Sequence, residues 1–376
     1  MARHALPSPV AITELSCSPL ENTDQQSLGV TYWFDAEPAG EPYTLNVHLR
    51  GRLKSGADGE GASSTPGGRT EFAVTSTLEK VLPGSGRIAV TTRIPDVAPG
   101  QWEVVATPVR PAPAGAPSPW MEVRDPLLPR AATSGRTAFS PFVGALAPGV
   151  RLGAWPALVG TGFVLALVLQ SILARQVGLA GPRLFLLTVI ASALGLAGAK
   201  LYYLLTHRRE GRSPVTQGLS VQGFVITTVA TLVAGTFLLD LPLGTSLDVT
   251  APGLLLAMAV GRLGCLFGGC CVGRPTSSRW GVWSSDRRVG VRRIPVQLLE
   301  SGFSAALGAL ALLAVLTAPG VGSGLVLVAT VAAYVLGRQV LFPLRSIPRA
   351  TAHGRVVSLV AAAVALVASL GPLLLG

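Results

Sequence analysis

Seven apolar segments fill the second half of the chain. The length of each is close to that of a helix that crosses a bilayer, which is about twenty residues. They span residues 154–173, 184–205, 219–241, 249–267, 296–316, 324–342 and 356–375. Backbone groups in lipid must find their hydrogen bonds within the segment, and these segments lack the alternation of a membrane barrel. The sequence therefore predicts an all-α polytopic membrane bundle of about seven transmembrane helices.

The first part of the chain has a period of two instead. Leu45, Val47 and Leu49 alternate with polar residues, and similar alternation recurs from about residue 10 to residue 109 between Gly and Pro positions. This pattern is typical of half-buried strands, so we expect an all-β immunoglobulin-like sandwich. The run PAPAGAPSP between Arg110 and Trp120 predicts a spacer. The expected domains are a β-sandwich at 1–109, a Pro-rich linker at 110–150 and a seven-helix membrane domain at 151–376.

The positive charge belongs to the membrane half. Residues 1–150 hold 12 Lys or Arg against 14 Asp or Glu, whereas residues 151–376 hold 18 against 5. These basic residues lie between apolar segments and do not form one solvated block. We therefore expect the lipid bilayer and its anionic lipids as partners, and no nucleic acid.

Polar residues interrupt the apolar segments at corresponding ends. Successive spans alternate in direction, so the ends of the second, fourth and sixth and the starts of the third and fifth share one side of the membrane. This argument predicts a cationic polar pocket at one leaflet. The alternative is that each charge snorkels separately to the interface. The residues concerned are Lys200, Gln222, Arg262, Gln297, Glu300 and Arg338.

The richest motif is GRLGCLFGGCCVGR at residues 261–274, which closes the fourth apolar segment. Its inner arginine, Arg262, would face hydrocarbon unless an anionic or polar group meets it. Its five glycines allow close approach of backbone or ligand. The alternative is a small-residue helix contact capped by basic residues.

This motif resembles the signature of the prolipoprotein diacylglyceryl transferase family, which begins Gly-Arg-x-Gly-Asn-Phe and ends in Gly-Arg. Five further motifs are similar to those of the family and occur in the family's order. They are GAKLYYL at 198–204, GLSVQG at 218–223, RIPVQLLES at 293–301, YVLGRQVLFPLR at 334–345 and GRVVSL at 354–359. The strand domain has no part in the resemblance.

The resemblance implies a transferase that moves a diacylglyceryl group from phosphatidylglycerol to the cysteine thiol of a prolipoprotein lipobox. Such chemistry needs fixed cations for the phosphate and loss of the thiol proton. The implied catalytic residues are Arg262, Arg338, Gln222 and Glu300. The implied substrate-binding residues are Lys200, Tyr203, Gly261, Gly264, Cys265, Gly273, Arg293 and Gln297.

Several positions depart from the family pattern. Gln222 stands where the family has a histidine that is its candidate base. Either another group such as Glu300 or His207 accepts the proton, or the proton leaves with the phosphate or with water, or the activity has changed. Cys265 replaces the signature asparagine, and Cys270 replaces an acidic residue. Cys265, Cys270 and Cys271 have a C-x4-C-C spacing that, with His207, could hold a soft metal. Packing beside the pocket is the favoured role, so neither a metal nor a cofactor is expected.

Two other functions stay open at this level: a non-catalytic relative that binds phospholipid or an envelope partner, and a membrane transporter. The resemblance implies a bacterial plasma membrane protein with an extracytoplasmic active face. The positive-inside rule opposes this orientation, because the basic loops follow the second, fourth and sixth segments. The strand domain is expected to position acceptor proteins or to bind envelope components.

Overall fold

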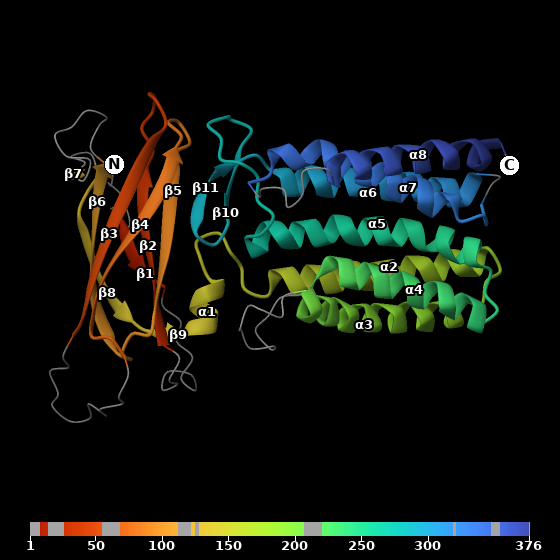
Figure 1. Ribbon diagram of the computed structural model, residues 1–376, viewed down its shortest axis with the longest axis horizontal. Coiled ribbons are helices and arrows are strands. Elements are labelled where there is room, and N and C mark those ends of the chain that lie inside the picture. The colour runs from red at the N-terminus through yellow and green to blue at the C-terminus, as the bar shows by residue number, and fades with distance from the viewer. Residues whose placement is uncertain are drawn as a thin grey trace, which may run out of the picture. The chain divides into compact units, whose positions relative to one another are not determined.

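The computed structural model describes residues 8–13, 26–54, 68–111, 122–124, 128–206, 220–318, 321–346 and 354–375 (Figure 1). The chain divides into two compact units. The first unit combines residues 1–155, 265–297 and 344–348, and the second combines 156–264, 298–343 and 349–376. Each unit is therefore assembled from segments that are far apart in the sequence.

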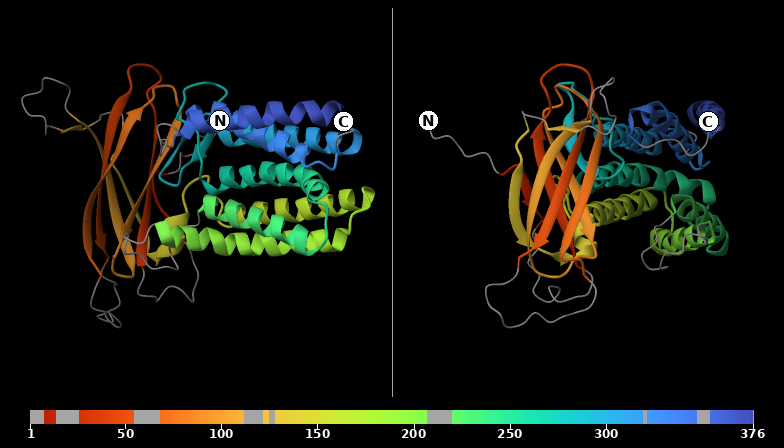
Figure 2. Two further views of the ribbon diagram at one scale, coloured as in Figure 1. Left: turned by 45° about the vertical axis from the view of Figure 1, so that its right-hand side comes forward. Right: turned by 60° about the vertical axis from the view of Figure 1, so that its left-hand side comes forward.

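The first unit contains two antiparallel sheets (Figures 1 and 2). One sheet has the order β1-β2-β5-β11-β10 with β9 beside β2, and the other has β4-β3-β6-β7 with β8 beside β6. The strands are β1 Val10–Ile12, β2 Gln26–Asp35, β3 Tyr43–Leu53, β4 Glu71–Val81, β5 Arg87–Pro95, β6 Gln101–Pro111, β7 Glu122–Arg124, β8 Ala131–Arg136, β9 Ala138–Phe139, β10 Val282–Ser285 and β11 Val289–Arg293.

One hydrophobic core lies between the two sheets. The alternating residues of β3, Leu45, Val47 and Leu49, are buried in it, together with Tyr32 of β2 and Trp102 of β6. The polar ends of the two aromatic residues are satisfied, because the Tyr32 hydroxyl donates to the Pro129 carbonyl at 3.0 Å and the Trp102 indole donates to the Ala98 carbonyl at 3.0 Å. The period-two pattern thus correctly predicted a two-sheet β domain, while its immunoglobulin-like topology stays a prediction.

The segment expected to be a linker contributes to the sheets. Strand β6 reaches Pro111, β8 pairs with β6 from Gln101↔Arg136 to Ala106↔Ala131, and β9 pairs with β2. A short helix, α1 Ser140–Ala145, follows. Strand β8 reads AATSGR and buries only Gly135. Because a strand of small and polar residues carries no apolar alternation, its sequence gave no strand signal.

The β10–β11 hairpin comes from late in the chain and continues the first sheet. Val289 pairs with Val90 and Gly290 with Ala89, so β11 lies beside β5. The Trp283 ring stacks on Trp33 with centroids 5.7 Å apart, and its indole N–H donates to the Arg87 carbonyl at 2.9 Å. A hairpin between two membrane helices is thus part of the β domain. The sequence analysis did not anticipate this union.

The second unit is helical, and its helices are drawn from yellow-green to blue in Figure 1. The helices are α2 Ala154–Gln176, α3 Gly181–Thr206, α4 Val221–Leu238, α5 Leu243–Gly268, α6 Val296–Thr317, α7 Leu325–Leu341 and α8 Gly354–Leu375, with a 3-10 turn, η2, at Phe342–Leu344. All of these helices except α4 are long and apolar enough to cross a membrane. The prediction of a multi-pass helical membrane protein is confirmed.

The pairing of β5 with β11 also constrains α4. Strand β5 precedes α2 and strand β11 follows α5, so the two strands must lie on the same side of the membrane to pair. The chain must then cross an even number of times between them. Helices α2, α3 and α5 supply three crossings, so we infer that the apolar α4 supplies the fourth. Together with α6, α7 and α8 this gives seven crossings, in agreement with the number of apolar segments.

A buried carboxylate organises the start of α7. Asp248 of α5 is fully buried and accepts hydrogen bonds from the backbone N–H groups of Gly322 and Gly324 at 2.9 and 3.0 Å. Its other oxygen accepts from Val326 at 2.9 Å and Leu327 at 3.4 Å. The first N–H groups of a helix lack partners within it, and its positive end favours a negative charge. Asp248 therefore ties α5 to the first turn of α7.

The contribution of the β10–β11 hairpin to the stability of the β domain can be tested with two tryptophan variants. Replacing Trp283 with Ala removes the stacking on Trp33 and the hydrogen bond to Arg87, which should lower the free energy of unfolding by about 2 kcal/mol. Trp280, which is 76% exposed, lies two residues before the hairpin. Thermal unfolding followed by intrinsic fluorescence should show a lower Tm for W283A and an unchanged Tm for W280A. Equal melting of the two variants would mean that the hairpin does not stabilise the sheet.

Candidate functional site

Arg262 is held between three helices of the second unit. Its Nε lies 3.0 Å from Oε2 of Glu300, and its Nη2 donates to the Tyr334 hydroxyl at 3.1 Å. Glu300 is only 1% exposed and Tyr334 6%. A charge in apolar surroundings is stable only when it is paired, so this ion pair ties α5 to α6 and the hydrogen bond ties α5 to α7.

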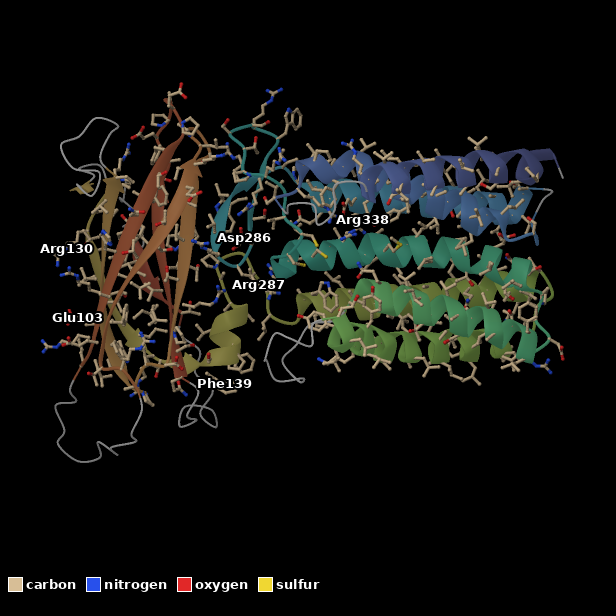
Figure 3. All side chains as sticks on the ribbon, in the orientation of Figure 1. Glu103, Arg130, Phe139, Asp286, Arg287 and Arg338 are labelled. Carbon is tan, nitrogen blue, oxygen red and sulfur yellow. The ribbon has the colours of Figure 1, made fainter. Side chains whose placement is uncertain are left out.

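Arg338 lies on the same face of α7 as Tyr334, because residues four apart on a helix lie one above the other. The side chain of Arg338 is half-buried, and Figure 3 labels it. Tyr334 thus connects the helix face that carries Arg338 with the guanidinium of Arg262. The sequence analysis did not name Tyr334 as a site residue, although its i, i+4 spacing from Arg338 was the available signal.

Lys200, Tyr203 and Gln222 lie together on the α3–α4 pair. A Cβ added to Gly223 would lie 2.5 Å from the Gly198 carbonyl oxygen, so only glycine allows these two helices to approach this closely. The Ser220 N–H donates to the Ala199 carbonyl at 3.1 Å, and the Ser220 hydroxyl donates to Oε1 of Gln222 at 2.8 Å. The structure therefore groups these three candidates on one helix pair, whereas Arg262 and Glu300 meet on α5 and α6.

In the first unit, Gly273 occupies a position that no other residue fits. It forms a single β-bridge with Arg345, and the N–H of Ser346 donates to the Val272 carbonyl at 3.0 Å. A Cβ at Gly273 would lie 2.0 Å from the carbonyl oxygen of Ile294. By contrast, a Cβ at Gly261 would meet only Val159, at 3.8 Å, which is an ordinary contact. Close backbone approach is therefore built at Gly273 and not at Gly261, while Gly264 is simply buried in α5.

Arg293 is a buried anchor of the same loop. Its Nη1 donates to the Gly273 carbonyl at 3.2 Å and to the Ser346 hydroxyl at 3.3 Å, and its Nη2 donates to Asp286 Oδ2 at 2.8 Å. Burial lowers the pKa of Arg293, and the Asp286 carboxylate opposes that effect. These contacts show a guanidinium that holds the 273–293 loop and its hairpin together. Its substrate-binding role stays a prediction.

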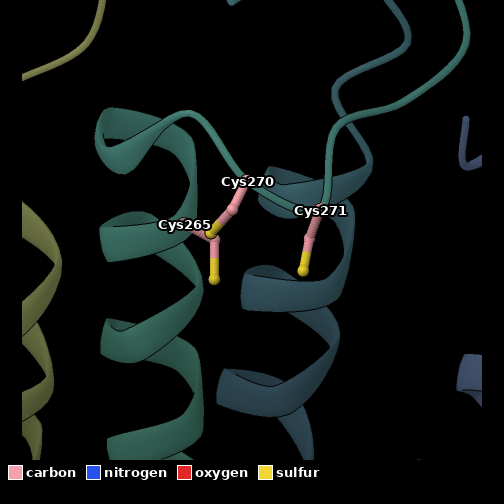
Figure 4. A group of neighbouring side chains, drawn as sticks. All are labelled: Cys265, Cys270 and Cys271. Carbon is pink, nitrogen blue, oxygen red and sulfur yellow. The ribbon is translucent and has the colours of Figure 1, made fainter. Parts of the chain in front are cut away.

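The three cysteines of the motif converge after α5 (Figure 4). Cys265 lies in the last turn of α5, Cys270 and Cys271 follow the helix, and the three Sγ atoms lie within 4.8 Å of one another. Hydrogen bonds with the Cys265 and Cys271 thiols, together with burial, raise the pKa of Cys270. Gln297, which is almost fully buried, donates to the Cys270 carbonyl at 3.1 Å. His207, the other group considered for a metal or for the thiol proton, lies outside the described residues.

Comparison with known proteins shows which family the sequence resembles. The sequence profile described as "Prolipoprotein diacylglyceryl transferase" matches residues 143–370. Phosphatidylglycerol--prolipoprotein diacylglyceryl transferase 2 of Clostridium perfringens is 28% identical over 175 residues, which cover 43% of this chain and 66% of that relative. A phosphatidylglycerol--prolipoprotein diacylglyceryl transferase of Dehalococcoides mccartyi is 36% identical over 88 residues, which cover 22% of this chain and 34% of that relative. The chain thus spans less than two thirds of either relative's length.

Two glycine substitutions in the motif should have opposite outcomes. Gly273→Ala forces a Cβ against the Ile294 carbonyl, and the backbone shift should cost about 1–3 kcal/mol of stability. Gly261→Ala adds only an ordinary contact with Val159, inside α5, where Ala is favoured over Gly by about 1 kcal/mol. We expect thermal unfolding of the purified protein to show a lower Tm for G273A and an equal or higher Tm for G261A. A G273A protein that melts with the wild type would contradict the crowded geometry.

Proposed function

The chain belongs to the prolipoprotein diacylglyceryl transferase family, and from this we propose that it transfers a diacylglyceryl group from phosphatidylglycerol to a prolipoprotein cysteine thiol. In this reaction the sulfur attacks the glycerol carbon that carries the phosphate. A carbon–sulfur bond forms as the carbon–oxygen bond to phosphate breaks, and glycerol phosphate leaves with the electron pair. The products are a thioether and a glycerol phosphate.

The observation that carries this proposal is the paired Arg262 beside the face of α7 that bears Arg338. Negative charge grows on the departing phosphate, and fixed cations in a water-poor site stabilise such charge most effectively. The Glu300 contact at 3.0 Å and the Tyr334 contact at 3.1 Å hold the Arg262 guanidinium in one place. In this proposal Arg262 and Arg338 bind the phosphate, and Glu300 positions Arg262.

Gln222 cannot act as a base, unlike the histidine that the family resemblance implies at this position. An amide accepts and donates hydrogen bonds, but it cannot carry a proton at neutral pH. Gln222 is exposed on α4 and its Oε1 already accepts from Ser220. We therefore assign it the orientation of substrate, and we assign the thiol proton to the departing phosphate. Lys200 and Tyr203, on the neighbouring helix α3, would contact the lipid headgroup.

The replacement of that histidine is the ground for one rival function, a relative that binds phospholipid without transferring it, although the family match does not favour this rival. Such a protein would bind phosphatidylglycerol in a manner that depends on Arg338 and would form no thioether. The assay below separates the two functions, because it measures both binding and product.

We propose that the protein resides in the bacterial plasma membrane with its β domain and the α5–α6 loop on the extracytoplasmic side. The basic residues of that loop are weak evidence for a cytoplasmic position, because many of them bind the protein itself. Arg287 donates to the Gly268 carbonyl at 2.9 Å and Arg288 to the Thr77 carbonyl at 3.1 Å, and Arg293 is buried. Because these arginines stabilise the loop itself, their number is no evidence for which side of the membrane the loop lies on.

Arg338→Ala should lower transferase activity about a hundredfold, because it removes one fixed cation from the phosphate. Arg338→Lys keeps the charge but loses the planar fork, so its activity should fall between the two. Arg175→Ala, which removes an exposed arginine at the end of α2, is the matched control and should keep full activity. The measurements are glycerol phosphate release and thioether formation on a lipobox peptide, with phosphatidylglycerol binding in parallel. Wild-type binding without any thioether would establish the non-catalytic function instead.

Protease protection should reveal both the orientation and the number of crossings. We expect an epitope inserted at Gly61, before α2, to be cleaved in intact spheroplasts, and an epitope added after Gly376 to be protected. Seven crossings place the two epitopes on opposite sides of the membrane. Epitopes that behave alike would contradict the crossing of α4, and the reverse pattern would contradict the proposed orientation.

A further inference from the structure

The thiols of Cys265, Cys270 and Cys271 lie close enough together to share one ligand. Their Sγ atoms are all within 4.8 Å of one another. Sulfur atoms around a bound ion lie about 2.3 Å from it, and hence about 4 Å apart. A contraction of about 1 Å or less, well within the range of side-chain rotation, would therefore bring all three onto one ion. In the part of the chain that the structure describes, this is the one group of three such metal-ligating side chains.

The backbone between these cysteines is folded into a preformed loop. Gly269 and Cys271 both have positive φ, at 67° and 53°, and the N–H of Cys270 donates to the Cys265 carbonyl at 3.1 Å. A Cβ at Gly269 would lie 2.8 Å from Val150 Cγ2 and 3.0 Å from the Ser285 carbonyl oxygen, so this turn needs glycine. A non-glycine residue such as Cys271 rarely adopts positive φ. The surrounding structure thus maintains a strained turn whose result is the convergence of three thiols (Figure 4).

Burial around the group suits an ion that enters from one side. Cys265 is 7% exposed at the end of α5, whereas Cys270 and Cys271 are half-buried beyond the helix. No disulfide joins these three cysteines to one another. Soft thiolate ligands select ions such as Cu⁺ and Zn²⁺ over hard ions such as Mg²⁺ and Ca²⁺. Plain packing would explain one buried cysteine, but it does not explain a strained turn that gathers three.

We propose that Cys265, Cys270 and Cys271 form a binding site for one thiophilic metal ion, Cu⁺ or Zn²⁺. Three thiolates complete the coordination of Cu⁺, whereas Zn²⁺ takes a fourth ligand, which water can supply at the half-exposed side. Each thiol that binds the ion gives up its proton, so binding releases protons to the solvent. Metal binding is measured without any lipid or peptide substrate, so its failure is distinguishable from a failure of the proposed function.

The test is a metal titration of the full-length protein in detergent under reducing, oxygen-free conditions. Competition with a chromophoric chelator is run once for Cu⁺ and once for Zn²⁺. We expect one ion per chain for at least one of the two metals. Loss of an indirect supporting contact already weakens metal sites about tenfold, so each single Cys→Ser change at the three positions should weaken binding at least that much. The triple variant should bind no stoichiometric ion.

Cys17→Ser is the matched control, because it removes the fourth cysteine of the sequence and leaves the three proposed ligands unchanged, so it should keep one ion per chain. The ion that binds should also raise the Tm of the wild-type protein, and this readout is independent of whether the triple variant folds. The proposal is overturned if neither ion binds stoichiometrically, if the triple variant binds as well as the wild type, or if the bound ion leaves the wild-type Tm unchanged.

Discussion

The pairing of a guanidinium with a carboxylate inside an apolar helix bundle is the constraint on which the second unit depends. An unpaired charge in such surroundings is expensive, so Arg262 and Glu300 must face each other at 3.0 Å for α5 and α6 to pack at all. The Tyr334 hydroxyl extends the same requirement to α7. The residues of the proposed phosphate site thus also fix which helix faces meet. At the start of α7, the Asp248 carboxylate has a related role with backbone N–H groups as its partners.

A second interaction, the pairing of β11 with β5, makes the β domain part of the membrane protein's own loop structure. A domain joined only by a Pro-rich spacer would be free to move. Here the α5–α6 connection supplies two strands, a stacked Trp283 and a core residue, Val291, to that domain. Arg293 then links the hairpin to Gly273 of the signature motif. The β domain and the part of the family motif from Cys265 onward therefore belong to one compact unit.

The departures from the family pattern separate into two kinds. At position 222 the resemblance implies a histidine, and the amide of Gln222 cannot take up a proton as that group can. Cys265 and Cys270 replace polar side chains with thiols, and together with Cys271 they create a chemically new feature with its own geometry. The first kind modifies the proposed transfer reaction. The second kind adds the soft ligands of the proposed metal site.

The sequence by itself determined the features that follow from local periodicity and from order along the chain. The lengths of the apolar segments predicted the helices, the period of two predicted the sheets, and six ordered motifs predicted the family. Alternating direction also placed Arg262 and Glu300 at one end of the bundle, because that argument needs only the count of crossings.

The choice of Glu300 and Tyr334 as the partners of Arg262 was decided by the packing of three helices, which no local pattern encodes. The same holds for β8, whose small residues carry no signal, and for the β10–β11 hairpin, whose strand β11 pairs with β5 about 200 residues earlier. Only the tertiary structure decides such contacts, because hydrogen bonds and buried charges select partners by distance in space and not by separation in sequence.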